Sequence, residues 1–245
     1  MREDTGIIIS NELIAKDVYK MVIKSNLGSE MCPGQFVNIK VDGYFLRRPI
    51  SISQYDENAY TIVYKVVGDG TSKLSQMEAG RSLNVVGPCG HGFDIDDVEP
   101  LLVGGGVGVP PLLQVAKEFN KRNVNADVVL GFNSKEDVFY EEEFKKLGCN
   151  VYIATMDGSY CIKGTVMDAI KEHSVKSDYL YSCGPMPMLK ALDNAYTKGY
   201  LSFESRMACG MGACMGCVCK DKKDHDIYYR ICKEGPVFEI GKVDF

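Results

Sequence analysis

The residues with the most distinctive chemistry are five of the chain's ten cysteines, which fall within its last 37 positions. Cys209, Cys214 and Cys217 follow the spacing C-x4-C-x2-C, and Cys219 and Cys232 come after them. Plant-type [2Fe–2S] clusters take their first three thiolates with this spacing. The tail therefore predicts an iron–sulfur cluster.

Glycines between these cysteines support the cluster. Gly210 and Gly212 let the backbone wrap closely and turn its N–H groups toward sulfur, which stabilises an anionic centre. A structural zinc ion is the main alternative, but such sites usually use two C-x2-C pairs, whereas Cys214 and Cys217 form only one. A fifth thiolate would exceed the four that a cluster needs, so we expect Cys219 to be spare.

A second candidate site lies at residues 47–53, with the sequence Arg-Arg-Pro-Ile-Ser-Ile-Ser. Arg48 can bind a diphosphate bidentately, and the hydroxyl of Ser51 can reach the edge of an isoalloxazine ring. Alone, this stretch also fits a solvated strand end. Residues 68–72, before a helix-like stretch at 73–79, offer amide donors for a second phosphate. Together these segments predict FAD.

A third candidate site binds a nicotinamide dinucleotide. A glycine turn follows a strand and opens a helix, where a pyrophosphate would sit: Gly104, Gly105 and Gly106. Val109 stands at the third glycine position, so the motif is irregular. Cys183 and Gly184 end a later strand, and this thiol either faces the nicotinamide or simply packs. One lysine among acids at 131–137 favours NAD over NADP.

The elements that position these sites change character along the chain. Residues 1–97 read as short strands between turn residues, which predicts a small antiparallel barrel that holds FAD. We expect its strands at 6–9, 18–23, 36–41, 60–67 and 83–86. Residues 98–200 alternate strands with helices, which predicts a parallel sheet with helices on both faces. We expect its strands at 101–103, 127–130, 150–153 and 179–182, and its helices at 110–120, 141–146, 165–171 and 187–198. The cysteine-rich segment spans 201–245.

Composition limits the remaining function classes. The chain has 245 residues, 45% of them apolar and 25% charged, with a net charge of −5. This balance gives no basic surface for nucleic acid, and no apolar run approaches the roughly 20 residues of a bilayer span. An acidic N-terminus lacks the features of a signal peptide, so we expect a cytoplasmic protein without a membrane partner. None of the three histidines stands in a nucleophile-and-base pattern, so we expect no catalytic side chain.

The order of these motifs resembles the ferredoxin–NADP reductase superfamily. Arg-Pro-x-Ser, Gly-Pro-x-Gly, a triple-glycine turn and Cys-Gly-Pro run in sequence through the first 200 residues. The tail, with Glu204-Ser-Arg-Met-Ala-Cys209 and Cys232-Lys-Glu-Gly-Pro, resembles the electron transfer subunits of NAD-dependent dihydroorotate dehydrogenases. The resemblance covers essentially the whole chain.

The resemblance also implies site residues. The FAD site would comprise an Arg-Pro-Ile-Ser segment, a short strand and a Gly-Thr pair: Arg48, Pro49, Ile50, Ser51, Val63, Tyr64, Lys65, Gly70 and Thr71. Lys65 departs from the family pattern, which often has Arg there. The family's cluster ligands carry over to Cys209, Cys214, Cys217 and Cys232.

The resemblance implies a partner and a pathway as well. An FMN-containing catalytic subunit would oxidise dihydroorotate in pyrimidine (UMP) biosynthesis, and this chain would pass the electrons through [2Fe–2S] and FAD to NAD+. The complex would be a heterotetramer with two copies of each chain. Two alternatives stay open: a related FAD/[2Fe–2S] subunit of a ferredoxin- or sulfide-linked oxidoreductase, and a zinc-stabilised binding module on a degenerate reductase fold.

Overall fold

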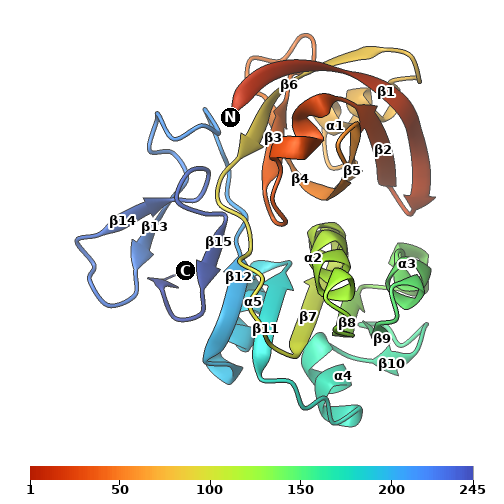
Figure 1. The fold of residues 1–245 in the computed structure, drawn as a ribbon, viewed down its shortest axis with the longest axis vertical. Helices are drawn as coiled ribbons and strands as arrows, with labels where there is room; N and C mark the ends of the chain where they lie inside the picture. The colour runs from red at the N-terminus through yellow and green to blue at the C-terminus, as the bar shows by residue number, and fades with distance from the viewer. Residues whose placement is uncertain (245) are drawn as a thin grey trace.

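The first 89 residues form a closed antiparallel barrel with the strand order β1-β2-β5-β4-β3-β6 (Figure 1). The structure is a computed structural model that describes residues 1–244, so Phe245, the last residue of the predicted cysteine-rich segment, lies outside the described residues. The barrel elements are β1 (Arg2–Ala15), β2 (Val18–Lys24), η1 (Asn26–Glu30), β3 (Phe36–Ile39), β4 (Arg48–Tyr55), β5 (Ala59–Lys65), α1 (Asp69–Ser75) and β6 (Ser82–Cys89).

Alternation of side chains explains how β3 and β4 sit in the barrel. Val37 and Ile39 of β3 belong to the barrel core, whereas Phe36 packs outside it with the C-terminal segment. On β4, Ile50 and Ile52 also point into the barrel core. Residues 47–53 therefore lie almost entirely within a barrel strand rather than at a solvated strand end, because this alternation buries one face.

A seven-stranded sheet follows, with the order β10-β9-β8-β7-β11-β12-β15. Its strands are parallel except β15, which runs antiparallel to β12. The elements are β7 (Pro100–Gly105), η2 (Gly106–Gly108), α2 (Val109–Lys121), β8 (Asp127–Phe132), η3 (Lys135–Asp137), α3 (Glu141–Lys146), β9 (Asn150–Thr155), β10 (Ile162–Lys163), α4 (Val166–Glu172), β11 (Tyr179–Cys183), α5 (Met186–Ala195), β12 (Lys198–Ser202) and β15 (Val237–Glu239). This architecture confirms the predicted parallel α/β domain.

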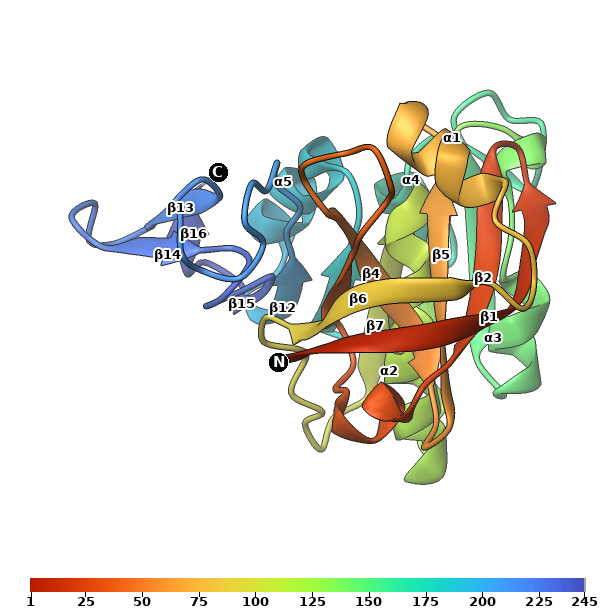
Figure 2. The same cartoon turned by 90° about the horizontal axis from the view of Figure 1, so that it is seen from above.

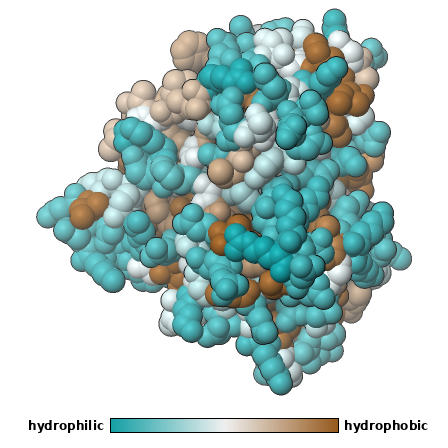
Figure 3. Space-filling view, in the orientation of Figure 1, coloured by the Kyte–Doolittle hydropathy of each residue, from teal (hydrophilic) through white to brown (hydrophobic). Residues whose placement is uncertain are grey.

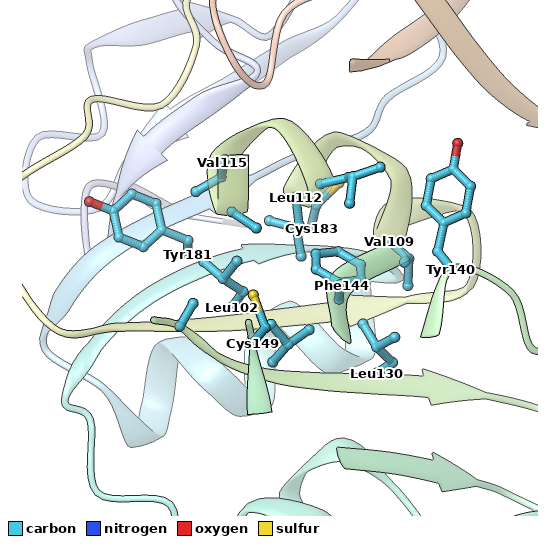
Figure 4. Packing of buried hydrophobic residues seen from close by; sticks show 14 of the residues in the cluster. Leu102, Val109, Leu112, Val115, Leu130, Tyr140, Phe144, Cys149, Tyr181 and Cys183 are labelled. Carbon is cyan, nitrogen blue, oxygen red and sulfur yellow. The ribbon is translucent and has the colours of Figure 1, made fainter. Parts of the chain in front are cut away.

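Helices cover both faces of this sheet. On β7, Leu102 packs with α2 and α3, while its neighbours Leu101 and Val103 pack with α4 and α5. Figure 4 shows the first of these layers, in which Leu112 of α2 and Phe144 of α3 lie among the side chains of the strands. The near-continuous apolar strands follow from burial on both faces. No helix within residues 1–244 has the length and apolar character needed to cross a bilayer.

The C-terminal segment joins the sheet and then leaves it. The helix expected at 187–198 ends at Ala195, because Tyr196 is extended (φ −120°, ψ 152°). The chain then passes through Gly199, which has φ +114° and packs so closely on Leu180 that a Cβ would lie 1.9 Å from its carbonyl oxygen. There β12 begins, and it runs across the predicted boundary at residue 200. A three-stranded sheet of β13 (Val218–Asp221), β14 (Tyr228–Arg230) and β16 (Val243–Asp244) projects from the rest of the molecule (Figure 2).

Candidate electron-transfer site

The predicted cluster cysteines lie in two pairs beside the barrel. Cys209 and Cys214 form one pair, close enough for Cys214 to lower the pKa of the Cys209 thiol. Cys217 and Cys232 form the other, and the Cys232 amide donates to the Cys217 sulfur at 3.4 Å. Among residues 1–244, no three His, Cys, Asp or Glu side chains lie close enough together to hold a metal ion. The structure therefore brings the four thiols together as two pairs rather than as one closed set.

Backbone amides connect the two pairs. The Gly212 N–H donates to the Cys232 sulfur at 3.1 Å, and the Ala213 N–H donates to the Cys209 sulfur at 3.3 Å. Gly212 has φ +84°, a left-handed conformation that glycine adopts without strain. Amides directed at sulfur stabilise thiolates, so the donor set and its surroundings fit an iron–sulfur cluster.

Backbone amides of residues 211–214 also change the acidity of Cys209. Desolvation disfavours its thiolate, but hydrogen bonds from the Met211, Cys214 and Ala213 amides outweigh this effect and lower the pKa of the Cys209 thiol to about 6. Desolvation, followed by the neighbouring Cys217, raises the pKa of the Cys232 thiol to about 12. A thiolate is the form that binds metal, so the surroundings of Cys209 favour the form that a ligand at this position would need.

Cys219 lies apart from the two pairs. Its thiol donates to the Tyr229 carbonyl at 3.6 Å, between β13 and β14. Burial raises the pKa of this thiol to about 11. The expected spare cysteine therefore has a structural hydrogen bond of its own.

A cavity of about 380 Å³ lies between the barrel and the segment that leads to the cluster cysteines. Eight of the nine predicted FAD residues line it: Arg48, Pro49, Ile50, Ser51, Val63, Tyr64, Lys65 and Thr71. The ninth, Gly70, lies directly against the guanidinium group of Arg48, because a Cβ at Gly70 would lie 2.3 Å from the Arg48 Nε. Two cationic side chains beside apolar walls suit a flavin and its diphosphate.

Three further residues of this cavity were not expected from the sequence. Phe36, Glu204 and Met207 also line this cavity. Glu204 is exposed into it, and desolvation by the walls raises the pKa of its carboxyl group. No spacing in the sequence could have identified these residues, because they meet only when the tail folds back on the barrel.

A second cavity, of about 460 Å³, opens at the carboxyl edge of the parallel strands, where dinucleotides bind in such sheets. Gly105 and Gly106 line it, and Gly106 has φ +52° with open space around its Cα. Gly104 lies beneath them, since a Cβ there would lie 2.8 Å from the side chain of Val109. The site also gains Asn133 and Thr165 from the ends of two neighbouring segments.

Cys183 and Gly184 do not line this cavity. The Cys183 thiol is 1% exposed and packs in the core beneath α2 (Figure 4). Burial strongly raises its pKa. Gly184 instead permits close packing, because a Cβ there would lie 3.0 Å from the Gly105 amide nitrogen. In this structure, these two residues support the glycine turn rather than reach into the cavity.

The two cavities share a wall. Lys65 and Val107 line both of them. Lys65 also crosses from the barrel to the α/β domain, where its Nζ lies 3.4 Å from the Asp137 carboxylate. A flavin and a nicotinamide bound in these cavities would therefore be neighbours.

Two parts of the chain match models of known protein families. Residues 204–244 match the iron–sulfur cluster binding domain of dihydroorotate dehydrogenase B, and residues 102–194 match an oxidoreductase NAD-binding domain. The chain is 51% identical over 259 residues to a dihydroorotate dehydrogenase B (NAD+) electron transfer subunit of Fusobacterium nucleatum subsp. nucleatum, covering 100% of this chain and 99% of that protein. A protein of the same description from Geobacillus sp. (strain WCH70) is 44% identical over 255 residues, with 99% of each chain covered.

A solved structure of an NADH-dependent reduced ferredoxin-NADP oxidoreductase, described in connection with flavin-based electron bifurcation, is similar in fold. Its TM-score is 0.87 at 30% sequence identity, and the match covers 98% of this chain and 89% of that one. The fold of nearly the whole chain therefore recurs in that oxidoreductase.

Proposed function

This chain belongs to the family of electron transfer subunits of NAD-dependent dihydroorotate dehydrogenase B, and we propose the residues through which it carries electrons. It is an oxidoreductase subunit, and its cofactors are FAD and a [2Fe–2S] cluster, with NAD as the electron acceptor. It carries electrons from the catalytic subunit toward NAD+ in pyrimidine biosynthesis.

One observation supports the order of the sites. The flavin cavity is bounded on one side by residues Ser202 to Met207, which lead to Cys209, and on the other by Lys65 and Val107, which it shares with the nicotinamide cavity. A bound cluster exchanges single electrons, whereas a bound flavin exchanges either single electrons or a hydride. Together they can therefore pass on electrons that arrive one at a time to NAD+, which accepts a hydride.

In this proposal, the chain's own residues bind the cofactors and orient them. Arg48 and Lys65 supply positive charge to the diphosphate of FAD, while the Ser51 hydroxyl lies on the cavity wall for the ring. Gly105 and Gly106 leave backbone room for the dinucleotide. Cys209, Cys214, Cys217 and Cys232 would hold the cluster. Gly104, Cys183 and Gly184 would pack against the turn that Gly105 and Gly106 form and so shape it. No side chain is assigned a proton-transfer role.

The partner is the catalytic subunit, and we infer that it carries FMN and assembles with this chain as two copies of each. Met211, Met215 and Val218, exposed on the cluster segment, offer it an uncharged surface. Figure 3 shows paler brown, moderately hydrophobic atoms at the upper left, where Figure 1 places this segment. The sequence boundaries at 97/98 and 200/201 and a cytoplasmic location remain predictions.

The experiment is dihydroorotate-dependent formation of NADH by this chain after anaerobic co-purification with its partner. We expect activity that requires both chains, with flavin and iron in the purified complex. If NADH reduces the bound flavin but dihydroorotate yields no NADH with any co-purified chain, the reductase chemistry holds and the pyrimidine assignment is refuted. A ferredoxin- or sulfide-linked complex would give that second result.

A further inference from the structure

Strand β3 faces two sites at once. Its outward positions are Phe36, which lines the flavin cavity, and Asn38, two residues further along the same face. Asn38 is 1% exposed, although it carries a polar amide. A buried amide on the outside of a barrel requires a partner, because an unpaired polar group is costly to bury.

The hydrogen-bond partner of Asn38 lies in the loop of residues 208–216, which carries Cys209 and Cys214 and is called the cluster loop. The Asn38 side-chain amide donates to the Gly210 carbonyl at 2.9 Å, across 172 residues of sequence. Gly210 follows Cys209 directly and has φ +64°. A Cβ at Gly210 would lie 2.5 Å from the Asn38 Nδ2, so glycine is needed for this approach. The loop therefore rests directly on the amide of Asn38.

A second contact holds the other end of the ligand set. The His91 N–H, just beyond β6, donates to the Gly235 carbonyl at 2.6 Å, and the His91 Nδ1 lies 2.8 Å from the Lys233 carbonyl oxygen. Lys233 follows Cys232 directly. The barrel side therefore contacts the C-terminal segment at Gly210, next to the first predicted ligand, and at Lys233, next to the last.

We propose that Asn38 is a positioning residue that fixes the cluster loop against the wall of the flavin cavity and so sets the spacing for electron transfer between the two cofactors. This inference rests on the proposed function. Electron transfer between fixed centres slows steeply as their separation grows, so a loop held by β3, whose Phe36 lines the flavin cavity, keeps that separation constant. The hydrogen bond from Asn38 acts on geometry and adds no chemistry of its own.

The test is Asn38→Leu in the co-purified complex, with Asn84→Leu as the matched control. Asn84 lies on the neighbouring strand β6, and its side-chain amide donates to Glu3, away from the cluster segment. Three readouts are compared: the EPR spectrum of the reduced cluster, amide hydrogen exchange over residues 208–216, and stopped-flow absorbance after mixing with NADH. The last separates reduction of the flavin site by hydride from the later arrival of single electrons at the cluster site.

We expect Asn38→Leu to keep its flavin and iron and to accept hydride from NADH at the wild-type rate. Electron arrival at the cluster should slow several-fold, and the EPR line shape should change. Loop amides should exchange roughly tenfold faster or more, the factor expected when one buried hydrogen bond is lost. A merely structural role would lower stability without changing the EPR spectrum. Wild-type behaviour in all three readouts would overturn the inference.

A variant on the loop side keeps the inference testable if Asn38→Leu does not fold. Gly210→Ala places a methyl group against the Asn38 amide, and Asn38→Ala in the same chain removes that amide. We expect Gly210→Ala to slow electron arrival by displacing the loop from Asn38, and Asn38→Ala in the same chain to add little further slowing, because the contact is already lost. An unaffected Gly210→Ala, or a second slowing of full size when Asn38→Ala is added, would overturn the inference. A wild-type complex without flavin or iron would instead refute the proposed function, and this inference with it.

Discussion

Gly70→Ala tests whether Arg48 holds FAD. Gly70 lies in the first turn of α1, where alanine is the better helix former by up to about 1 kcal/mol. The new Cβ would lie 2.3–2.7 Å from three atoms of the Arg48 guanidinium group. Because that group is the end of a flexible side chain, we expect it to move away rather than the helix to break. Its present position also places it 4.6 Å over the ring of Tyr44.

The cost should therefore fall on FAD binding and not on folding. A hydrogen bond to a charged group contributes about 1.5–3 kcal/mol, which corresponds to roughly ten- to hundredfold weaker binding when it is lost. The assay is titration of flavin-depleted protein with FAD, together with the melting temperature of the depleted protein. Gly68→Ala is the control, because a Cβ at Gly68 meets nothing within 4 Å and its φ of −176° is extended.

Unchanged FAD affinity in Gly70→Ala, at an equal or higher melting temperature, would refute the role of Arg48. A fall in affinity of the same size in Gly68→Ala would show instead that the whole turn is sensitive. Only the difference between the two variants isolates the guanidinium group.

Three further predictions follow from the sites. Cys214→Ser should abolish the visible circular dichroism of the cluster and leave FAD bound, whereas Cys219→Ser should keep both. Asp168→Asn weakens the acceptor at the start of α4, where the carboxylate accepts from the Thr165 N–H at 2.7 Å, and should lower the free energy of unfolding by roughly 0.5–1 kcal/mol at pH 7. Lys65→Met removes the pair with Asp137, which should cost no more than about 1 kcal/mol of stability in urea but slow reduction of the flavin by NADH.

The pH dependence of Asp168 has a definite sign. Hydrogen bonds from Thr165 lower the pKa of the Asp168 carboxyl group in the folded protein. Its contribution is therefore complete above the ordinary carboxyl pKa and is lost as the pH falls through the lowered value. The difference between wild type and Asp168→Asn should shrink between pH 7 and pH 3, and a difference that grew in acid would contradict the argument.

For Cys219→Ser, loss of the cluster signal would add Cys219 to the ligands. For Lys65→Met, an unchanged rate of flavin reduction would remove Lys65 from the shared wall.

Residues close together in the sequence were predicted well because local chemistry defines them. The C-x4-C-x2-C spacing and the glycines between the cysteines depend on one loop, and the structure directs the amides of that loop at sulfur. The alternation of strands and helices after residue 98 likewise follows from burial of each strand on both faces. The resemblance of the motifs to a known family added the strand residues 63–65 to the flavin site, and they line the cavity.

The chemistry of each site and the order of the sites along the chain could be predicted from the amino-acid sequence alone. How the sites meet depends on the three-dimensional fold. Asn38 and Gly210 are 172 residues apart, and Lys65 reaches Asp137 across two domains. The three-dimensional fold also places the Cys183 thiol in the core, although the strand that carries Cys183 ends at the ligand edge of the sheet. Contacts of this kind depend on which faces remain to be buried once the elements have formed, and no local spacing records them.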